Sequence, residues 1–195
     1  MTRLTRDDIV AGAGRRFARY GYHGTSMRDL GEDLGILGSS IYSHVGGKQE
    51  LLVAVVERGA AFFEESSRDA LNTGTDPIDT LARLIAGHVD VLLDHRSEAR
   101  TYLTEVSSLD EDERRKIIAA RDSYEDVFVG TIRSAIDAGI VRDDVDPRLG
   151  AIYVLSVLNA VERWYREDGR VSRSEVASDI HEFVCRGLYG NDTEA

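Results

Sequence analysis

The chain has 195 residues, of which 42% are hydrophobic and 30% charged, and its formal net charge at pH 7 is −11. This length is sufficient for a sizeable core in one large or two small domains. The single cysteine, Cys185, excludes an intramolecular disulfide framework and favours a reducing compartment. No run approaches the ~18 apolar residues of a membrane span and no secretory apolar segment precedes the first helix, so we expect a soluble, cytoplasmic protein.

The charge is unevenly distributed along the chain. Residues 1–50 contain seven Lys and Arg against six Asp and Glu, a net charge of +1, so residues 51–195 contain 17 against 29, a net charge of −12. This difference predicts two domains, 1–50 and 51–195. An acidic body repels DNA, and any contact with nucleic acid must therefore be confined to residues 1–50.

Helical periodicity of the apolar residues dominates the chain. It predicts nine helices, at about residues 5–20, 27–34, 39–44, 48–70, 77–95, 98–106, 110–138, 147–167 and 173–189. Asp76-Pro77 and Asp146-Pro147 are typical of an N-cap followed by proline in the first helical position. Capping-box spacing is found in two pairs, Ser108 with Glu111 and Ser172 with Glu175. There is no sustained strand pattern, so the predicted fold class is all-α.

Residues 21–52 have the pattern of two short helices joined by a glycine turn. After Gly21 ends a preceding helix, Thr25 and Ser26 can cap the next one. Its apolar residues recur at helical spacing, at Met27, Leu30 and Leu34. Gly35 allows a left-handed turn, and a second short helix begins at Ser39. This arrangement is typical of a helix-turn-helix, whose second helix enters the DNA major groove.

With the preceding sequence DDIVAGAGRRFARYGY, residues 5–55 resemble the DNA-binding domain of the TetR family of bacterial transcriptional repressors. The matching positions are Ile9, Ala13, Phe17, Gly21, Tyr22, Thr25, Ser26, Arg28, Leu30, Gly35, Ile41, Tyr42, Lys48, Leu51 and Leu52. Three positions depart from the family pattern. Gly31 stands where the family usually has Ala, Leu37 replaces a polar residue that often caps the recognition helix, and His44-Val45 replace an aromatic pair.

The candidate DNA-binding residues lie in and around the two short helices. They are Thr25, Ser26, Arg28, Gly38, Ser39, Ser40, Tyr42, Ser43, His44 and Lys48. Serine hydroxyls can read base edges only at close approach, which a glycine before them allows, and Arg28 is the best candidate for a bidentate contact with guanine. The resemblance implies that Tyr42 and His44 bond phosphates, that Lys48 adds its charge and that the Thr-Ser pair anchors the first helix. The alternatives are a solvated or Glu32-paired Arg28 and a Tyr42 packed in the core.

Residues 147–189 form two helices that are apolar on more than one side. Such breadth predicts burial both within the subunit and against a partner. In TetR relatives the last two long helices form a four-helix dimer interface, so the resemblance implies a homodimer. The candidate interface residues are Leu155, Leu158, Val161, Ile180, Phe183 and Val184. The alternative is a purely intramolecular core.

The middle helices supply apolar residues with a few polar groups, a composition suited to an effector pocket. The candidate ligand-binding residues there are His88, Tyr102, Arg121, Tyr124 and Phe128. The segment from Asn159 to Glu175 also looks like TetR members that sense fatty or other acyl-CoA thioesters. That resemblance implies stacking of Trp164 on an adenine ring and contact of Arg163 with its phosphates, with a packed aromatic at a helix end as the alternative.

The sequence shows no pattern for catalysis or for a cofactor. His181 and Cys185 can share a helix face, but a structural zinc site requires four ligands, so we expect no metal. No glycine-rich phosphate loop, nucleophile elbow or metalloprotease motif occurs. The resemblance implies a ligand-responsive repressor that binds a palindromic operator as a dimer and is released by a small hydrophobic effector such as an acyl-CoA. The alternatives are a small-molecule-binding helical protein without DNA binding and an acyl-thioester hydrolase.

Overall fold

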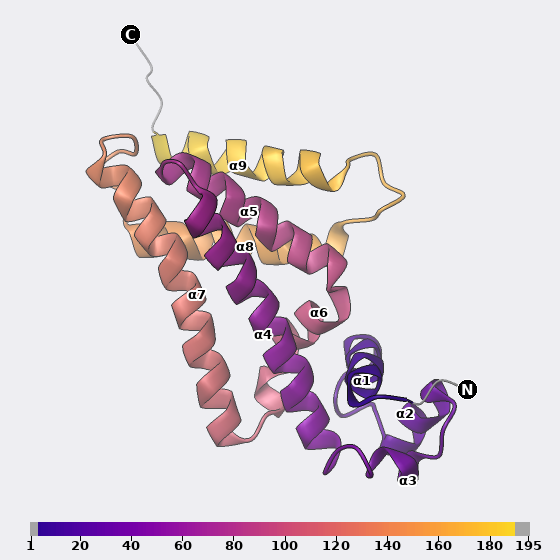
Figure 1. Ribbon diagram of the computed structural model, residues 1–195. Helices are drawn as coiled ribbons and strands as arrows, with labels where there is room; N and C mark the ends of the chain where they lie inside the picture. Colours follow the sequence, from indigo (N-terminus) through magenta and orange to yellow (C-terminus); the bar gives the residue numbers. More distant parts are fainter. Residues whose placement is uncertain (1–3, 190–195) are drawn as a thin grey trace. The chain divides into compact units, whose positions relative to one another are not determined.

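The computed structural model describes residues 4–189, which fold into nine α-helices and one short 3₁₀ helix, with no strand (Figure 1). The predicted all-α class and helix number are therefore confirmed. In chain order the elements are α1 (Arg6–Tyr20), α2 (Met27–Leu34), α3 (Gly38–Ile41), α4 (Lys48–Thr73), α5 (Pro77–Asp94), α6 (Arg96–Thr104), η1 (Val106–Ser108), α7 (Glu111–Asp137), α8 (Pro147–Trp164) and α9 (Arg173–Tyr189).

Three of the predicted helix caps are present. Asp76 Oδ1 accepts two backbone hydrogen bonds of 2.9 Å from the first turn of α5, which places Pro77 at the first helical position. Asp146 caps α8 in the same way. Ser172 and Glu175 form the expected capping box before α9.

The region between α5 and α7 differs from the prediction. α6 begins and ends two residues before the expected range, because His95 leaves the helical conformation and becomes the N-cap of α6. The expected capping box of Ser108 with Glu111 is wrong. Ser108 belongs to η1 and its hydroxyl donates to Glu105 Oε2 at 3.0 Å, so α7 begins only at Glu111.

α3 is shorter than the predicted range 39–44. After Ile41 the backbone continues in tight turns, in which Ser43 N donates to Ser40 O at 3.3 Å and His44 N donates to Ile41 O at 2.9 Å. Hydrogen bonds from an N–H to the carbonyl three residues earlier are of the 3₁₀ type, which is frequent at the ends of α-helices. The break is the Gly46-Gly47 pair, which separates this turn from α4.

The described chain divides into two compact units. The first comprises residues 4–62 and 95–120, and the second comprises residues 63–94 and 121–189. In the first unit α1 packs against α2 and α6, and α2 packs against α3. Its core is formed by fully buried apolar side chains, among them Ile9, Phe17, Leu30, Ile41, Leu51, Leu52 and Val55.

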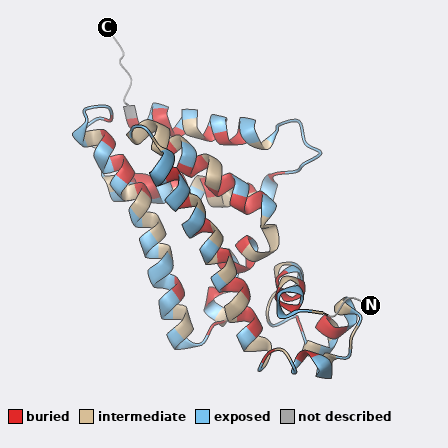
Figure 2. Cartoon of the chain, viewed as in Figure 1, coloured by how far each residue is buried: buried red, intermediate tan, exposed pale blue. Residues whose placement is uncertain are grey.

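In the second unit α5 packs against α8 and α9, and α8 packs against α9. The core includes Leu81, Leu84, Ile85, Leu92, Phe128, Val154 and Leu158. Each helix carries buried residues beside exposed ones (Figure 2), as expected of amphipathic helices that enclose a core. Within residues 4–189 no helix combines the length and the apolar character that crossing a membrane requires.

Candidate nucleic-acid interface and interior polar cluster

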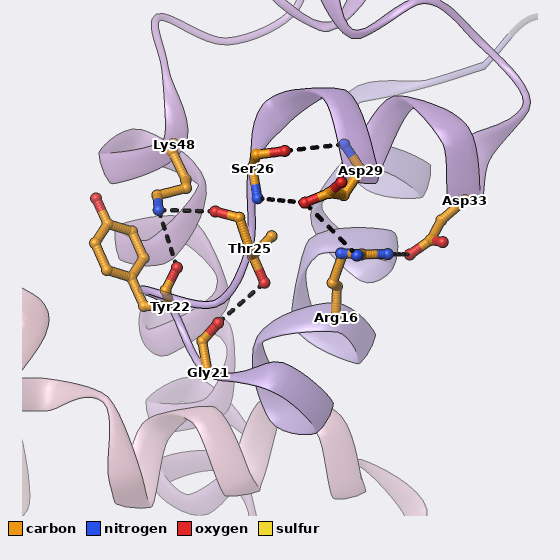
Figure 3. A network of polar contacts seen from close by, with 8 residues as sticks. All are labelled: Arg16, Gly21, Tyr22, Thr25, Ser26, Asp29, Asp33 and Lys48. Carbon is orange, nitrogen blue, oxygen red and sulfur yellow. Dashed lines mark hydrogen bonds and ion pairs between the residues drawn. The ribbon is translucent and has the colours of Figure 1, made fainter.

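The start of α2 is fixed by Thr25 and Ser26. Ser26 is the N-cap: its Oγ accepts a hydrogen bond from Asp29 N at 3.2 Å, and its own N–H donates to Asp29 Oδ2 at 3.0 Å (Figure 3). These hydrogen bonds hold the pKa of Asp29 below its ordinary value. Thr25 is 3% exposed, and its hydroxyl donates to Gly21 O at 2.9 Å. Capping is therefore confirmed for Ser26, whereas Thr25 fastens the turn that follows α1.

Arg16 joins α1 to α2. Its Nη1 lies 2.7 Å from Asp33 Oδ2 and its Nη2 lies 3.7 Å from Asp29 Oδ2 (Figure 3). The hydrogen bond to Asp33 raises the pKa of the guanidinium. Because two carboxylates of α2 engage it, Arg16 holds the two helices together.

Two glycines allow α3 to begin against the backbone of α2. A Cβ added to Gly31 would lie 2.6 Å from Gly38 N, and a Cβ added to Gly38 would lie 2.8 Å from Met27 O. Real Cβ atoms do not come so close to backbone atoms, so both positions require glycine. This contact explains why the chain has Gly31 where the family usually has Ala. It also gives Gly38 a role inside the protein, in addition to the expected close approach to DNA.

The turn between α2 and α3 has the predicted geometry. Gly35 adopts φ 68° and ψ 27°, the left-handed conformation that glycine favours, and its N–H bonds to carbonyls of the last turn of α2. Ile41 is 0% exposed and anchors α3 in the core. The two short helices therefore form the predicted helix-turn-helix.

Most candidate DNA contacts lie on the exposed side of α2 and α3. The exposed residues are Ser26, Arg28, Ser39, Ser40, Tyr42 and Ser43, while Gly38 and His44 are half-buried. Because Tyr42 is 56% exposed, the alternative of core packing is wrong. Arg28 forms no hydrogen bond or close ion pair with Glu32 or with any other residue in the described part of the chain, and its charge only adds a small effect to the lowered pKa of Asp29. Its guanidinium is therefore available to a ligand.

Lys48 has partners that the sequence did not indicate. Its Nζ donates to Tyr22 O at 2.9 Å and to Thr25 O at 2.8 Å, and it lies 4.1 Å from the centre of the Tyr22 ring (Figure 3). The Tyr22 hydroxyl in turn donates to Gln49 Oε1 at 2.7 Å. The ammonium thus ties the start of α4 to the segment before α2, and only one of its three N–H groups remains for a phosphate.

The second unit contains a group of polar side chains, which we call the interior polar cluster: the buried His88 with the half-buried Tyr124 and Asn159. His88 is 2% exposed and its Nδ1 lies 3.0 Å from the Tyr124 hydroxyl. Burial lowers the pKa of His88 to about 3, and a smaller opposing effect comes from the side chain of Asn159. The imidazole is therefore neutral at pH 7.

The side chains of His88 and Asn159 interact with each other, which is the smaller effect on the His88 pKa. Beyond that contact, His88 Nε2 and Asn159 Oδ1, which are both buried, have no hydrogen-bond partner in the described range. Aromatic rings surround them: the ring centres of Phe63 and His88 are 4.8 Å apart, and those of Tyr124 and Phe128 are 5.5 Å apart. Asn159 was not among the candidate ligand residues, although its amide stands out in the apolar stretch VLSVLNAV.

The other candidate ligand residues lie on three different helices. Tyr102, on α6 in the first unit, is 4% exposed and packs against Gly59 of α4. Arg121 is half-buried on α7, and Arg163 is exposed near the end of α8. Trp164 is 53% exposed, so the alternative of a packed aromatic at this helix end is wrong. Its contact with a ligand stays a prediction.

The candidate dimer residues need correction. Leu158 and Val161 are 0% exposed, and Ile180 and Val184 are 8% and 7% exposed, so these four side chains belong to the core of their own unit. They lie on the side of each helix that packs inward. Leu155 is half-buried. Of the six candidates only Phe183 is exposed, at 67%.

A different set of apolar residues is exposed on α8. Tyr153 is 65% exposed, Leu149 47% and Ile152 38%. Leu149 and Tyr153 line a groove of about 570 Å³ together with Phe183 of α9. We call these three residues and Ile152 the α8–α9 apolar face. In the sequence the α8 part of this face corresponds to the segment Leu149–Tyr153, which lies about one turn before the candidate interface residues of α8.

The pair His181 and Cys185 shares a helix face as expected, with 3.3 Å between His181 Nε2 and Cys185 Sγ. Among residues 4–189 no group of three or more His, Cys, Asp or Glu side chains is arranged to hold a metal ion.

Two parts of the sequence match known protein families. Residues 9–55 match the bacterial regulatory proteins of the tetR family, and residues 74–188 match the tetracyclin repressor-like C-terminal domain. The second match alone spans more than half of the chain. The chain belongs to the TetR family. It is therefore a helix-turn-helix transcriptional regulator, from a family of regulators rather than enzymes.

Relatives of this TetR-family regulator match it over nearly its whole length. The HTH-type transcriptional repressor KstR2 of Rhodococcus jostii (strain RHA1) is 25% identical over 199 residues, covering 96% of this chain and 98% of the relative. The structure of the TetR family regulator PfmR from Thermus thermophilus is 32% identical with a TM-score of 0.84, covering 92% and 98%. The structure of AibR in complex with isovaleryl coenzyme A and operator DNA has 24% identity and a TM-score of 0.82, covering 94% of this chain and 97% of AibR. This similarity shows that the two proteins share a fold.

Proposed function

We propose that this TetR-family regulator is a repressor that binds a palindromic operator as a homodimer and is released by an acyl-CoA thioester. Residues 1–50 bind the operator, and residues 51–195 bind the effector and form the dimer. The observation that carries the proposal is the exposed side of α2 and α3, where polar side chains face solvent on a glycine-packed helix-turn-helix. A surface of this kind fits a major groove.

In the proposed complex α3 lies in the major groove. The exposed Ser39 and Ser43 reach base edges, and Arg28 contacts guanine. Tyr42 and His44 bond phosphates and fix the orientation of the helix. The seven Lys and Arg side chains of residues 1–50 make this binding sensitive to salt to the extent that they meet phosphates, because each such contact releases counterions.

The proposed dimer uses the α8–α9 apolar face. Tyr153 and Phe183 are each about two-thirds exposed, an unusual state for large apolar side chains that lie next to one another. A two-fold axis through this face would pair it with the same face of a second copy. The two α3 helices of such a dimer suit two half-sites about one helical turn apart.

The proposed effector site includes the interior polar cluster. Its aromatic walls suit an acyl chain, and His88 Nε2 and Asn159 Oδ1, which have no partner outside their mutual contact, are where a polar group of the ligand can bond. Because His88 is neutral, the cluster offers it no positive charge for a free carboxylate, whose burial would be costly. This favours a thioester over a free acid. The isovaleryl coenzyme A named for the AibR structure is a ligand of that class.

α4 provides the connection between effector and operator. Phe63, in its second half, contacts His88, while Val55, in its first half, contacts Gly14 of α1. A ligand that displaces Phe63 moves this continuous helix and changes the spacing of the two α3 helices. It releases the operator only by binding the DNA-incompetent state more tightly.

Operator release and calorimetry test the proposal. Purified protein bound to a selected operator is titrated with acyl-CoAs from isovaleryl to stearoyl and with the matching free acids. We expect release at micromolar acyl-CoA and much less with the acids. His88→Phe removes the polar atoms of the ring. It should lower the affinity for the effector without lowering the affinity for the operator. Intact DNA binding with no heat of binding for any acyl-CoA would refute the effector class alone.

A further inference from the structure

Leu37 is the feature of the helix-turn-helix that the proposed function leaves unexplained. It is 74% exposed, more than any other large apolar residue in the described part of the chain. It occupies the N-cap of α3 with φ −68° and ψ 138° and makes no side-chain cap hydrogen bond. Ser, Thr, Asp and Asn are preferred at such a position because their side-chain oxygen accepts a backbone N–H. Leucine therefore gives up a cap and exposes apolar surface to water.

The packing of α3 brings the residue after Leu37 against the backbone of Arg28. The next residue, Gly38, lies so close to the start of α2 that an added Cβ would be 3.0 Å from the Cα of Arg28. Arg28 is exposed and, within residues 4–189, has no ion-pair partner. The same exposed side also presents Ser39 and Ser40, which are small and polar. An exposed apolar side chain at the N-cap of α3 and an exposed guanidinium at the start of α2 thus come from backbone segments that pack together, at the end of α3 that leads into the proposed groove.

The major groove offers one apolar group at the base edges, the C5 methyl of thymine. A leucine can contact it, whereas serine hydroxyls and a guanidinium cannot gain from it. Guanine offers the O6 and N7 pair that arginine binds. We propose that Leu37 contacts the C5 methyl of a thymine, next to a guanine contacted by Arg28, and that it is a specificity-determining residue of this regulator. This inference rests on the proposed placement of α3 in the major groove.

The test removes the methyl group from the DNA and the side chain from the protein. The preferred sequence is first selected from random DNA by the wild-type protein. Each thymine of both half-sites is then replaced by deoxyuridine, and binding is measured for wild type and Leu37→Ala. For one thymine we expect wild-type affinity to fall about fourfold per half-site, the effect of one lost methyl contact, with no further fall in the variant. Arg28→Ala should relax the preference for the adjacent guanine.

Leu37→Ser is the matched control for folding. It restores a capping oxygen, so its thermal midpoint should be at or above that of wild type, yet it should lose the sensitivity to deoxyuridine. If wild type, Leu37→Ala and Leu37→Ser share one deoxyuridine profile, Leu37 does not read the methyl and the inference is wrong. A uniform loss of affinity for every sequence would overturn it in the same way. If wild type selects no sequence at all, the placement in the major groove fails as well, and with it the proposed function.

Discussion

The helix-turn-helix and the α8–α9 apolar face are both exposed, but only the helix-turn-helix has a geometry that is fixed by contacts within its own short segment. α2 and α3 are held by local contacts: a capping box, a left-handed glycine and two glycines whose backbones touch. Within residues 4–189 nothing covers Tyr153 or Phe183, which are about two-thirds exposed. The first surface is complete in one copy, whereas the second lacks a partner. A change in the first should therefore act through the geometry of one copy, and a change in the second through association.

The largest expected effect is on association. Tyr153→Glu combined with Phe183→Glu would place unpaired charges in the proposed apolar interface, and the two-fold axis would double their number. Each should destabilise the dimer by about 3–5 kcal/mol. We expect sedimentation velocity to show monomers or aggregate instead of a dimer of 21.6 kDa subunits, and operator affinity should fall by at least about 100-fold.

The matched control for this change is Ile118→Glu. Ile118 is 45% exposed but lies on α7, outside the α8–α9 apolar face. It should leave the sedimentation coefficient and operator affinity unchanged. A wild-type protein that is monomeric at micromolar concentration, or a double variant that remains dimeric, would show that this face has another use.

Gly31→Ala tests the close packing of the first surface. Its Cβ would lie 2.6 Å from Gly38 N, and since backbone cannot yield as a side chain does, α3 must move. We expect a loss of up to about 3 kcal/mol in the free energy of unfolding, together with loss of operator binding. Gly130→Ala is the control: its Cβ would meet nothing within 4 Å, and the same substitution in α7 should stabilise by about 0.5–1 kcal/mol. Equal effects of the two would contradict the packing argument.

The interior polar cluster makes stability depend on pH. The pKa of His88 is lowered to about 3 in the folded protein, so between pH 6.5 and 3 the unfolded chain binds the additional proton. Stability from the buried neutral ring is therefore fully present above about pH 6.5 and falls as the pH decreases. Between pH 7.5 and pH 5.0 this group alone should lower the free energy of unfolding by about 2 kcal/mol.

Urea unfolding at the two pH values tests this dependence. His88→Phe should remove most of the difference, because no proton is taken up at this position. Tyr124→Phe deletes the hydroxyl that contacts Nδ1 but keeps the ring of His88 buried, so the difference should persist. A His88→Phe variant with the wild-type pH dependence would assign the effect to other groups.

Prediction from sequence succeeded where the determinants are local. The Ser26 cap lies three residues from its partner, and the turn at Gly35 requires a conformation that glycine favours, so a short window contained the information. Four of the six candidate dimer residues lie in the core, because α8 has two apolar sides and no local pattern says that the side with Leu158 and Val161 is the one buried within the unit. The contact of Asn159 with His88 likewise joins residues that lie far apart in the sequence. Lys48 was assigned to phosphate because its carbonyl partners lie more than 20 residues earlier in the chain.

Lys48→Ala gives the smallest expected effect. It separates residues that hold the helix-turn-helix in shape from residues that recognise bases. Losing the bonds from Nζ to Tyr22 O and Thr25 O should lower the free energy of unfolding by about 1 kcal/mol, and binding to every DNA sequence should weaken alike. Arg28→Ala is the contrast, since Arg28 bonds nothing in the described chain: its melting temperature should be unchanged, while preference at one base position relaxes. Thermal melts and selection from random DNA measure both variants. If Lys48→Ala melts like wild type but loses phosphate-dependent, salt-sensitive binding, the lysine serves DNA directly and its carbonyl contacts do not contribute to stability.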